Sequence, residues 1–216
     1  NGGMAERPLS TRIVLGVSAV LLLALVVTVV PRLLAPRPLT ASAFDALLRS
    51  GKLAGVATSL TAEPAAPQLD LAQLRSAYQD TESCTAYWDA ASRHLLRQAD
   101  ALADDPNGSG VQQIDAELWD DAGAASDAVG AWSRCLADFG ARTKASYPVE
   151  VVRRGESAGV AWQYAQGLDL TNPVHLLTLR ERNLIVSLTL PDAPANDWLT
   201  ELAGRFHADV EAAAKG

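Results

Sequence analysis

The sequence predicts an α+β protein, in which one N-terminal transmembrane helix is followed by an antiparallel sheet with helices packed on one face. Three observations lead to this fold class. An uncharged apolar run covers residues 13–30, apolar residues recur at helical spacing through the middle of the chain, and strand-like alternation fills the last third. Strands in one block beside helices in others are typical of α+β domains.

The apolar run is about 18 residues long, which is close to the length that a helix needs to cross a bilayer core. It has no polar face, unlike a helix on the surface of a soluble core. A cleaved signal peptide is the alternative, because Ala41-Ser42-Ala43 offers a small-x-small site. The run is long for a signal peptide and ends well before that site, so we expect a span.

The predicted organisation is a short cytoplasmic tail (1–12), a transmembrane helix (13–30), a Pro-rich linker (31–40) and an extracytoplasmic domain (41–216). Two arginines precede the span and two follow it, so the positive-inside rule gives nearly a tie. The short tail and the two downstream cysteines favour a cytoplasmic N-terminus. We therefore expect a single-pass protein of the cell membrane that contacts the bilayer through residues 13–30.

The chain is acidic, with 18 Lys and Arg against 25 Asp and Glu and a formal net charge of −7. Arg7, Arg12, Arg32 and Arg37 all precede the predicted domain, so the domain is more acidic than the whole. Such a charge repels nucleic acid and anionic lipid headgroups. We expect no nucleic-acid partner, and solubility alone explains the excess of acids.

The two cysteines, Cys84 and Cys135, form an even set in an apparently exported domain, which favours one disulfide. That bond would close a loop of about 50 residues and stabilise the fold by roughly 4 kcal/mol in the chain-entropy description. The alternative is a pair of buried thiols on the cytoplasmic side of the membrane.

Helical spacing predicts a short helix over 41–53 and a long helical region over 69–104 that is broken near Thr81 to Ser83. A further helix begins after Asp120 or Asp121, which act as its N-cap, and runs to about Phe139. Cys135 lies near its end. The predicted disulfide would therefore join this helix to the one that starts near Cys84.

Alternating patterns predict strands in the rest of the domain, with a final amphipathic helix after Pro191. Arg180 to Asn183 is the expected hairpin turn between the last two strands. The predicted strands cover residues 56–59, 111–119, 149–153, 160–165, 174–179 and 184–190.

This order of elements, together with Trp132-Ser133-Arg134-Cys135 as a W-x-x-C pattern, resembles the extracellular sensor-domain family of the mycobacterial Ser/Thr kinase PknH. The chain lacks the kinase and the second disulfide typical of that family. The resemblance implies a non-enzymatic extracytoplasmic domain with a groove over its sheet.

No catalytic or metal-binding pattern emerges from the sequence. His94, His175 and His207 lie on three different elements, and none has a metal-ligand spacing. The acid pairs at 104–105 and 120–121 are explained by solvation and helix capping. We therefore expect neither an enzyme nor a bound metal or cofactor.

The candidate contacts for a ligand or partner are Trp162 and Tyr164, two large rings on one strand, and Arg180 and Arg182, basic residues near strand ends. The simpler explanation is that the rings belong to the core and the arginines to the solvated surface. The first functional hypothesis is an accessory subunit that docks on a larger membrane or cell-envelope complex. The expected host is an actinobacterial complex for respiration or for envelope assembly. The alternative is a sensor or small-ligand binding module.

Overall fold

In the computed structural model, the described part of the chain comprises residues 36–143, 149–169 and 172–216. The chain divides into two units, Asn1–Arg37 and Pro38–Gly216. The second unit holds all the helices and strands given below. The predicted tail (1–12) and span (13–30), and the linker up to residue 35, lie outside the described residues.

The helices of the described residues contradict the predicted membrane architecture. Within residues 36–143, 149–169 and 172–216, no helix combines the length and the apolar character needed to cross a bilayer. The longest, α6 (Ala122–Arg142), carries Asp127, Arg134 and Asp138 along its length. The transmembrane helix in the predicted fold class and the single-pass location in the cell membrane are contradicted by this finding.

Eight strands of the described chain form one antiparallel sheet in the order β1-β2-β3-β4-β8-β7-β6-β5. Two four-stranded meanders, β1 to β4 and β5 to β8, are therefore joined where β4 pairs with β8. The strands are β1 Lys52–Leu53, β2 Val56–Leu60, β3 Leu95–Ala103, β4 Gln113–Trp119, β5 Glu150–Ser157, β6 Val160–Asp169, β7 Asn172–Glu181 and β8 Leu184–Leu190.

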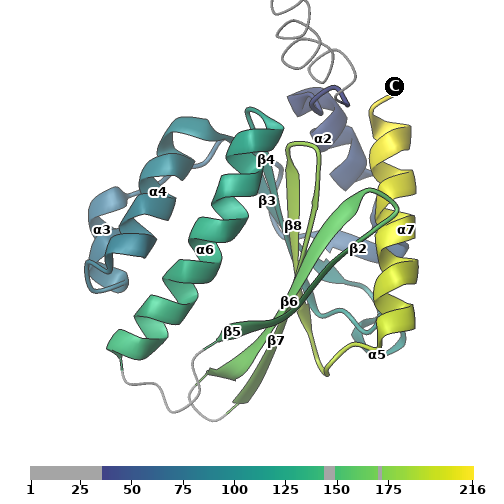
Figure 1. The fold of residues 1–216 in the computed structure, drawn as a ribbon. Coiled ribbons are helices and arrows are strands. Elements are labelled where there is room, and N and C mark those ends of the chain that lie inside the picture. The colour runs from purple at the N-terminus through teal and green to yellow at the C-terminus, as the bar shows by residue number, and fades with distance from the viewer. Residues whose placement is uncertain (1–35, 144–148, 170–171) are drawn as a thin grey trace, which may run out of the picture. The chain divides into compact units, whose positions relative to one another are not determined.

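Helices cover both faces of this sheet, so the prediction of helices on one face is wrong. Figure 1 shows α3, α4 and α6 on one side and α2 and α7 on the other. The reason is that both faces offer apolar side chains: on β8, Val186 belongs to one core and Ile185 to the other. The other helices are α2 Ala41–Arg49, α3 Leu71–Ala77, α4 Glu82–His94, α5 Pro106–Ser109 and α7 Asn196–Ala213.

The larger core lies on the α7 side of the sheet. The helix α7 buries a stripe at helical spacing, and the strands beneath it bury alternate residues, as the period of two requires. This face is almost wholly apolar. Its members include Leu199, Leu202, Phe206 and Val210 from α7, and Leu177, Leu179, Val186 and Leu188 from the sheet.

The smaller core, on the α6 side, is built from aromatic rings. Tyr87 lies 4.7 Å from Trp88 and 5.0 Å from Trp132 between ring centroids, and Tyr78 lies 5.2 Å from Phe139. These edge-on and tilted contacts are the favoured geometries for aromatic pairs. They join α4 to α6, and α6 is in turn packed on the sheet.

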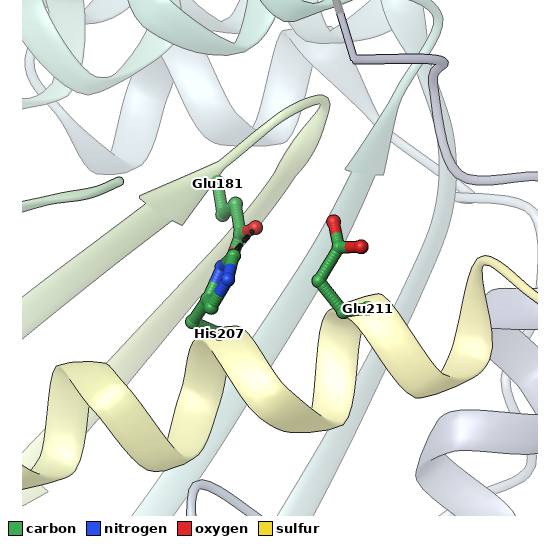
Figure 2. Close-up of side chains that lie close together, drawn as sticks. All are labelled: Glu181, His207 and Glu211. Atoms are coloured by element: carbon green, nitrogen blue, oxygen red, sulfur yellow. Dashed lines mark hydrogen bonds and ion pairs between the residues drawn. The ribbon is translucent and has the colours of Figure 1, made fainter. Parts of the chain in front are cut away.

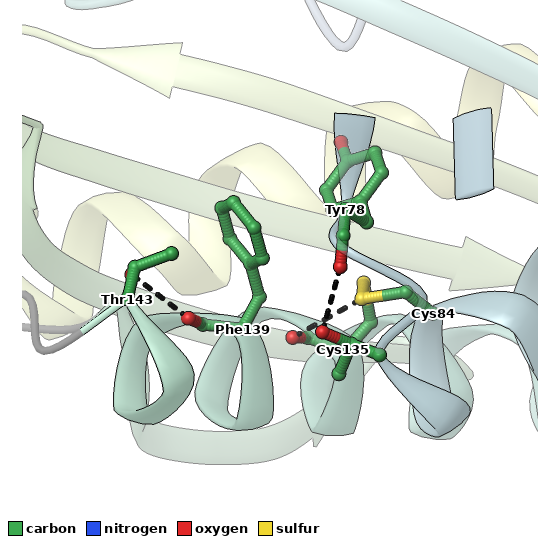
Figure 3. The surroundings of a disulfide bond; sticks show 6 residues. Tyr78, Cys84, Cys135, Phe139 and Thr143 are labelled. Atoms are coloured by element: carbon green, nitrogen blue, oxygen red, sulfur yellow. Dashed lines mark hydrogen bonds between the residues drawn. A yellow bond between two sulfur atoms is a disulfide. The ribbon is translucent and has the colours of Figure 1, made fainter. Parts of the chain in front are cut away.

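The predicted disulfide between Cys84 and Cys135 is confirmed. Both residues are fully buried, and the bond joins the first turn of α4 to the second half of α6. Figure 3 shows the bond with Tyr78 and Phe139 beside it. The bond therefore fixes the two helices of the aromatic core to each other.

The helix predicted over 69–104 is wrong in its last third. The helix α4 ends at His94, and Leu95–Ala103 forms the strand β3 between β2 and β4. Leu, Ala, Gln and Arg favour helix locally, but pairing with two neighbouring strands outweighs that preference. Burial alternates along most of the strand, with Ala99, Ala101 and Ala103 buried.

Most other predicted elements are confirmed with small shifts. The strand over 184–190 has the predicted bounds, and the strand predicted over 111–119 begins at Gln113. Asp121 caps α6, accepting a hydrogen bond from the backbone N–H of Ala124 at 2.8 Å. Thr81 precedes α4 as predicted, although its side chain makes no capping hydrogen bond.

The turn between β7 and β8 consists of Arg182 and Asn183, and Arg182 has a positive φ of 54°. Asn183 is buried and bonds both the N–H of Leu39, at 2.6 Å, and its carbonyl, at 3.1 Å. Its amide also donates to the carbonyl of Trp119 at 2.6 Å. This side chain therefore joins the segment before α2 to the middle of the sheet.

Candidate functional site

A hollow of about 630 Å³ lies between α6 and the strands β5, β6 and β7, within the size range of small-molecule sites. We call it the basic hollow. Its lining comprises Ser126, Val129, Gly130, Ser133, Arg134, Ala137, Glu150, Val151, Arg154, Gly155, Ala161, Trp162, Gln163, Thr178 and Arg180.

A second hollow of about 200 Å³, the aromatic hollow, adjoins the first, because Val129, Gln163 and Thr178 line both. The two together form what we call the α6 groove. The aromatic hollow is lined by Tyr87, Trp88, Asp115, Glu117, Ala128, Val129, Trp132, Gln163, Thr178, Ile185 and Ser187.

The groove exists because one side of α6 carries short side chains. Ser126, Gly130, Ser133 and Ala137 recur at spacings of four and three, so they share one face of the helix. A Cβ added to Gly130 would lie 3.4 Å from an Nη atom of Arg134, which shows that the guanidinium lies against this glycine. Small residues therefore leave room beneath the helix for both a cation and a ligand.

Gln163 lies where the two hollows meet. Its amide donates to Ser133 Oγ at 2.8 Å, and that hydroxyl donates in turn to the carbonyl of Val129 at 2.8 Å. Gln163 is 9% exposed. This chain of hydrogen bonds fixes the helix to strand β6 and divides the groove into its two parts.

The basic hollow brings together three arginines from three elements: Arg134 from α6, Arg154 from β5 and Arg180 from β7. Within the described residues, none of these guanidinium groups has a hydrogen-bond or ion-pair partner. Among the described residues that line the hollow, Glu150 is the one carboxylate. The hollow is thus a positive region on an acidic chain, where like charges near one another favour an anion between them.

The aromatic hollow has a buried carboxylate in its floor. Glu117 accepts hydrogen bonds from Tyr87 Oη at 2.8 Å and from Trp119 Nε1 at 3.1 Å. Burial raises the pKa of Glu117, although these two donors oppose that effect. Burial also raises the pKa of Asp115 beside it. This end of the groove therefore disfavours a second anion and suits an apolar or aromatic group.

Two indole N–H groups near the groove are buried and lack a hydrogen-bond partner among the described residues. One belongs to Trp88 in the wall of the aromatic hollow, and the other to Trp162, whose ring lies over Gly155 and packs against the α7-side core. Buried donors are normally paired, so each such exception calls for an explanation. An acceptor on a molecule bound in the groove could pair with the Trp88 group after a small shift of the ring.

The four predicted contact residues do not form one site. Arg180 lines the basic hollow. Trp162 contributes to the same lining, but its ring packs against the α7-side core and lies over Gly155, where an added Cβ would approach it to 2.4 Å. Tyr164 is buried in the α7-side core and bonds His175 at 2.7 Å. Arg182 forms an ion pair with Glu211 of α7.

Arg134 is not predicted from the sequence, because the apolar stripe of α6 and its cysteine are the dominant patterns in this segment. A signal was present in the neighbouring stripe of small residues, Ser126, Gly130, Ser133 and Ala137, which cannot fill the space beneath the helix. The adjacent pair Arg153 and Arg154 divides between the faces. Arg153 bonds Pro194 and Asn196 on the α7 side, whereas Arg154 lines the groove.

Residues able to hold a metal lie elsewhere in the described chain. Glu181, His207 and Glu211 place their potential ligand atoms within 4.8 Å of one another on the α7 side of the sheet. None of the predicted contact residues, Trp162, Tyr164, Arg180 and Arg182, belongs to this cluster.

Comparisons of the chain with protein-family models, with curated proteins and with solved structures found no match. The resemblance to the PknH sensor-domain family therefore stays a prediction.

Proposed function

We propose that this chain is a non-catalytic binding module whose α6 groove takes a small molecule with one acidic group and an apolar or aromatic body. The acidic group, a carboxylate, phosphate or sulfonate, lies among the three arginines of the basic hollow. The body extends past Gln163 toward the rings of the aromatic hollow.

The observation that carries this proposal is a set of three guanidinium groups in one concave site, none of which has a partner among the described residues. Arginine presents a planar set of donors that matches carboxylate and phosphate oxygens. Holding three such cations together without partners is unfavourable in the free protein, and an anion relieves that repulsion. On a chain with a net charge of −7, surface arginines would otherwise have many carboxylates to pair with.

The lining of the aromatic hollow is the reason to expect an apolar or aromatic body in the ligand. Trp88, Trp132 and Tyr87 offer large flat surfaces, and Ile185 adds an aliphatic one. The carboxylates in its lining repel a second acidic group, so the two ends of the groove favour opposite ends of an elongated molecule. This polarity fixes the direction in which the ligand lies.

The lining of the groove gives no support for catalysis. The described residues that line it include neither histidine nor cysteine. The hydroxyl of Ser133 donates to a backbone carbonyl and accepts from Gln163, so it is not held beside a base. Glu117 already accepts two hydrogen bonds, which suits a structural role.

The groove favours the small-ligand alternative over the accessory-subunit hypothesis drawn from the sequence. Among the described residues, the large apolar side chains that are exposed are Leu96, Leu102 and Val152, which lie on strands β3 and β5 at different parts of the sheet. Docking on a larger complex therefore stays a prediction from the sequence.

A pair of fluorescent probes tests the proposal. 8-Anilinonaphthalene-1-sulfonate has an acidic group and an aromatic body, and N-phenyl-1-naphthylamine has the same body without the sulfonate. We expect the sulfonate to bind the folded protein with one-to-one stoichiometry. The substitution Arg180→Gln should weaken its binding about tenfold, since a hydrogen bond to a charged group contributes roughly 1.5 kcal/mol or more.

The controls separate charge from general stickiness. Arg180→Gln should leave binding of the uncharged probe unchanged, and Arg49→Gln, in an exposed ion pair with Glu63, should affect neither probe. Rising salt should weaken the sulfonate alone. Equal loss of both probes in Arg180→Gln, or binding of several sulfonates per chain with no effect of the variant, would contradict the proposal.

A further inference from the structure

A glutamate occupies an apolar row of the α7-side core. Glu181 ends strand β7 on the same face as Leu177 and Leu179, and it is 6% exposed. Its Oε1 lies 2.8 Å from His207 Nδ1, whereas its Oε2 is buried and has no hydrogen-bond partner among the described residues. A carboxylate oxygen buried without a partner is costly, because desolvation is not offset.

The helix α7 brings two further ligand atoms to this oxygen. His207 and Glu211 are four residues apart and therefore lie on one face of the helix. Figure 2 shows Glu211 one turn beyond His207, with both side chains projecting toward the end of β7. One potential ligand atom from each of the three residues lies within 4.8 Å of the others.

We propose that Glu181, His207 and Glu211 form a binding site for a divalent transition-metal ion of the zinc class. One imidazole and two carboxylates are ligands that zinc accepts, at about 2.0–2.2 Å. Tetrahedral ligands at that distance lie about 3.4 Å apart. Small rotations of the three side chains would reach this geometry, and Glu181 would gain a partner for its buried oxygen.

The site is open on one side. The side chains of His207 and Glu211 are 40% and 30% exposed, so an ion can enter from solvent. Three protein ligands leave a fourth position for water or for an atom of another molecule. This site lies on the opposite face of the sheet from the α6 groove, so it does not depend on the function proposed for the groove.

Arg182 competes with a cation at this position. It forms an ion pair with Glu211, and Lys215 Nζ lies 4.0 Å from the other oxygen of that carboxylate. A bound ion must share Glu211 with these positive groups. Removing the charge of Arg182 should therefore strengthen metal binding. If the three residues only form ion pairs and hold no metal, the same substitution should not increase metal affinity.

The test is titration of the full chain with Zn²⁺ by calorimetry, and with Co²⁺ by visible absorption. We expect one saturable site and the intense bands of tetrahedral Co²⁺. Glu181→Gln and His207→Gln should each lower the affinity at least tenfold, and Arg182→Gln should raise it several-fold. Glu211→Gln, at a more exposed position, should also weaken binding.

His94→Gln is the matched control, since His94 pairs with Asp120 at 2.7 Å but has no third ligand in the cluster found among the described residues. It should leave Zn²⁺ binding unchanged. Melting curves without metal will show that each variant is folded. Affinity that is unchanged in Glu181→Gln, His207→Gln and Glu211→Gln, or no saturable binding by the folded wild type, would overturn the proposal.

Discussion

Removing the disulfide should destabilise the domain strongly, because Cys84 and Cys135 are 51 residues apart. In the chain-entropy description, opening a loop of that length increases the entropy of the unfolded chain by about 14 cal/mol/K, which is about 4 kcal/mol at 25 °C. A domain of this kind is stable by only about 5–15 kcal/mol in total. The bond therefore supplies a large share of the stability.

The perturbation is the double variant Cys84→Ala, Cys135→Ala, and the assay is urea unfolding followed by fluorescence and circular dichroism. With a slope of about 2 kcal/mol per molar urea, a loss of 4 kcal/mol lowers the midpoint by about 2 M. The wild type unfolded in the presence of reductant is the control and should behave like the variant. A loss below about 1 kcal/mol in both would refute the reasoning.

The same variant should also weaken binding in the α6 groove. The disulfide fixes α6 to α4, and α6 supplies one wall of both hollows. If the helix loosens, the guanidinium of Arg134 is less well placed against Arg154 and Arg180. We expect the sulfonate probe to bind less tightly to the folded variant, at urea concentrations far below its midpoint. Unchanged probe affinity would show that α6 is held by its aromatic contacts alone.

The remaining predictions concern buried polar groups. Asn183→Ala should lower the free energy of unfolding by roughly 2–4 kcal/mol in urea titrations, since it removes three buried hydrogen bonds to Leu39 and Trp119. Burial raises the pKa of Glu117, so its charged form is disfavoured in the folded state, and stability falls as pH rises through the raised pKa. Glu117→Gln should therefore be at least as stable as the wild type at pH 7, with the difference vanishing below the ordinary pKa of glutamate. A variant that is much less stable at pH 7 would show instead that the charged form is needed by Tyr87.

Much of the fold follows from local patterns that survive in the tertiary structure. The strand over 184–190 alternates between two cores, and the stripe of α7 matches the helical period. Asp121 was identifiable as a cap because its carboxylate bonds a free backbone N–H of the first turn. These elements have one periodicity and no competing one, so sequence alone locates them.

Other features depend on contacts that no local pattern records. Residues 95–103 favour a helix by composition, and only their pairing with β2 and β4 makes them a strand. Asp115 and Glu117 look like residues of a solvated face, yet they line a hollow together with the aromatic rings of α4 and α6, so the helical cover on this face is not evident from the sequence. The predicted transmembrane architecture rested on an apolar run, whereas every helix of the described chain is amphipathic or short.

Two of the four predicted contact residues contribute to the candidate site. Of the predicted contacts, Arg180, expected near a strand end, lines the groove, and Trp162 contributes to the lining although its ring packs against the α7-side core. Tyr164 and Trp162 share a strand face as predicted, and both rings lie on the α7 side, with Tyr164 in that core and Trp162 packed against it. Arg134 comes from a helix far away in sequence, and only the packing of α6 on the sheet brings it to the other arginines.

The measurement that tests the central claim most directly is a spectrum of the tryptophan indole N–H groups during titration with 8-anilinonaphthalene-1-sulfonate. Single Trp→Phe variants assign the signals. Binding in the α6 groove predicts that the signals of Trp88 and Trp132 shift and saturate together, while that of Trp198, packed against the α7-side core, stays in place. A shift of Trp198 with the groove signals unmoved would contradict the account.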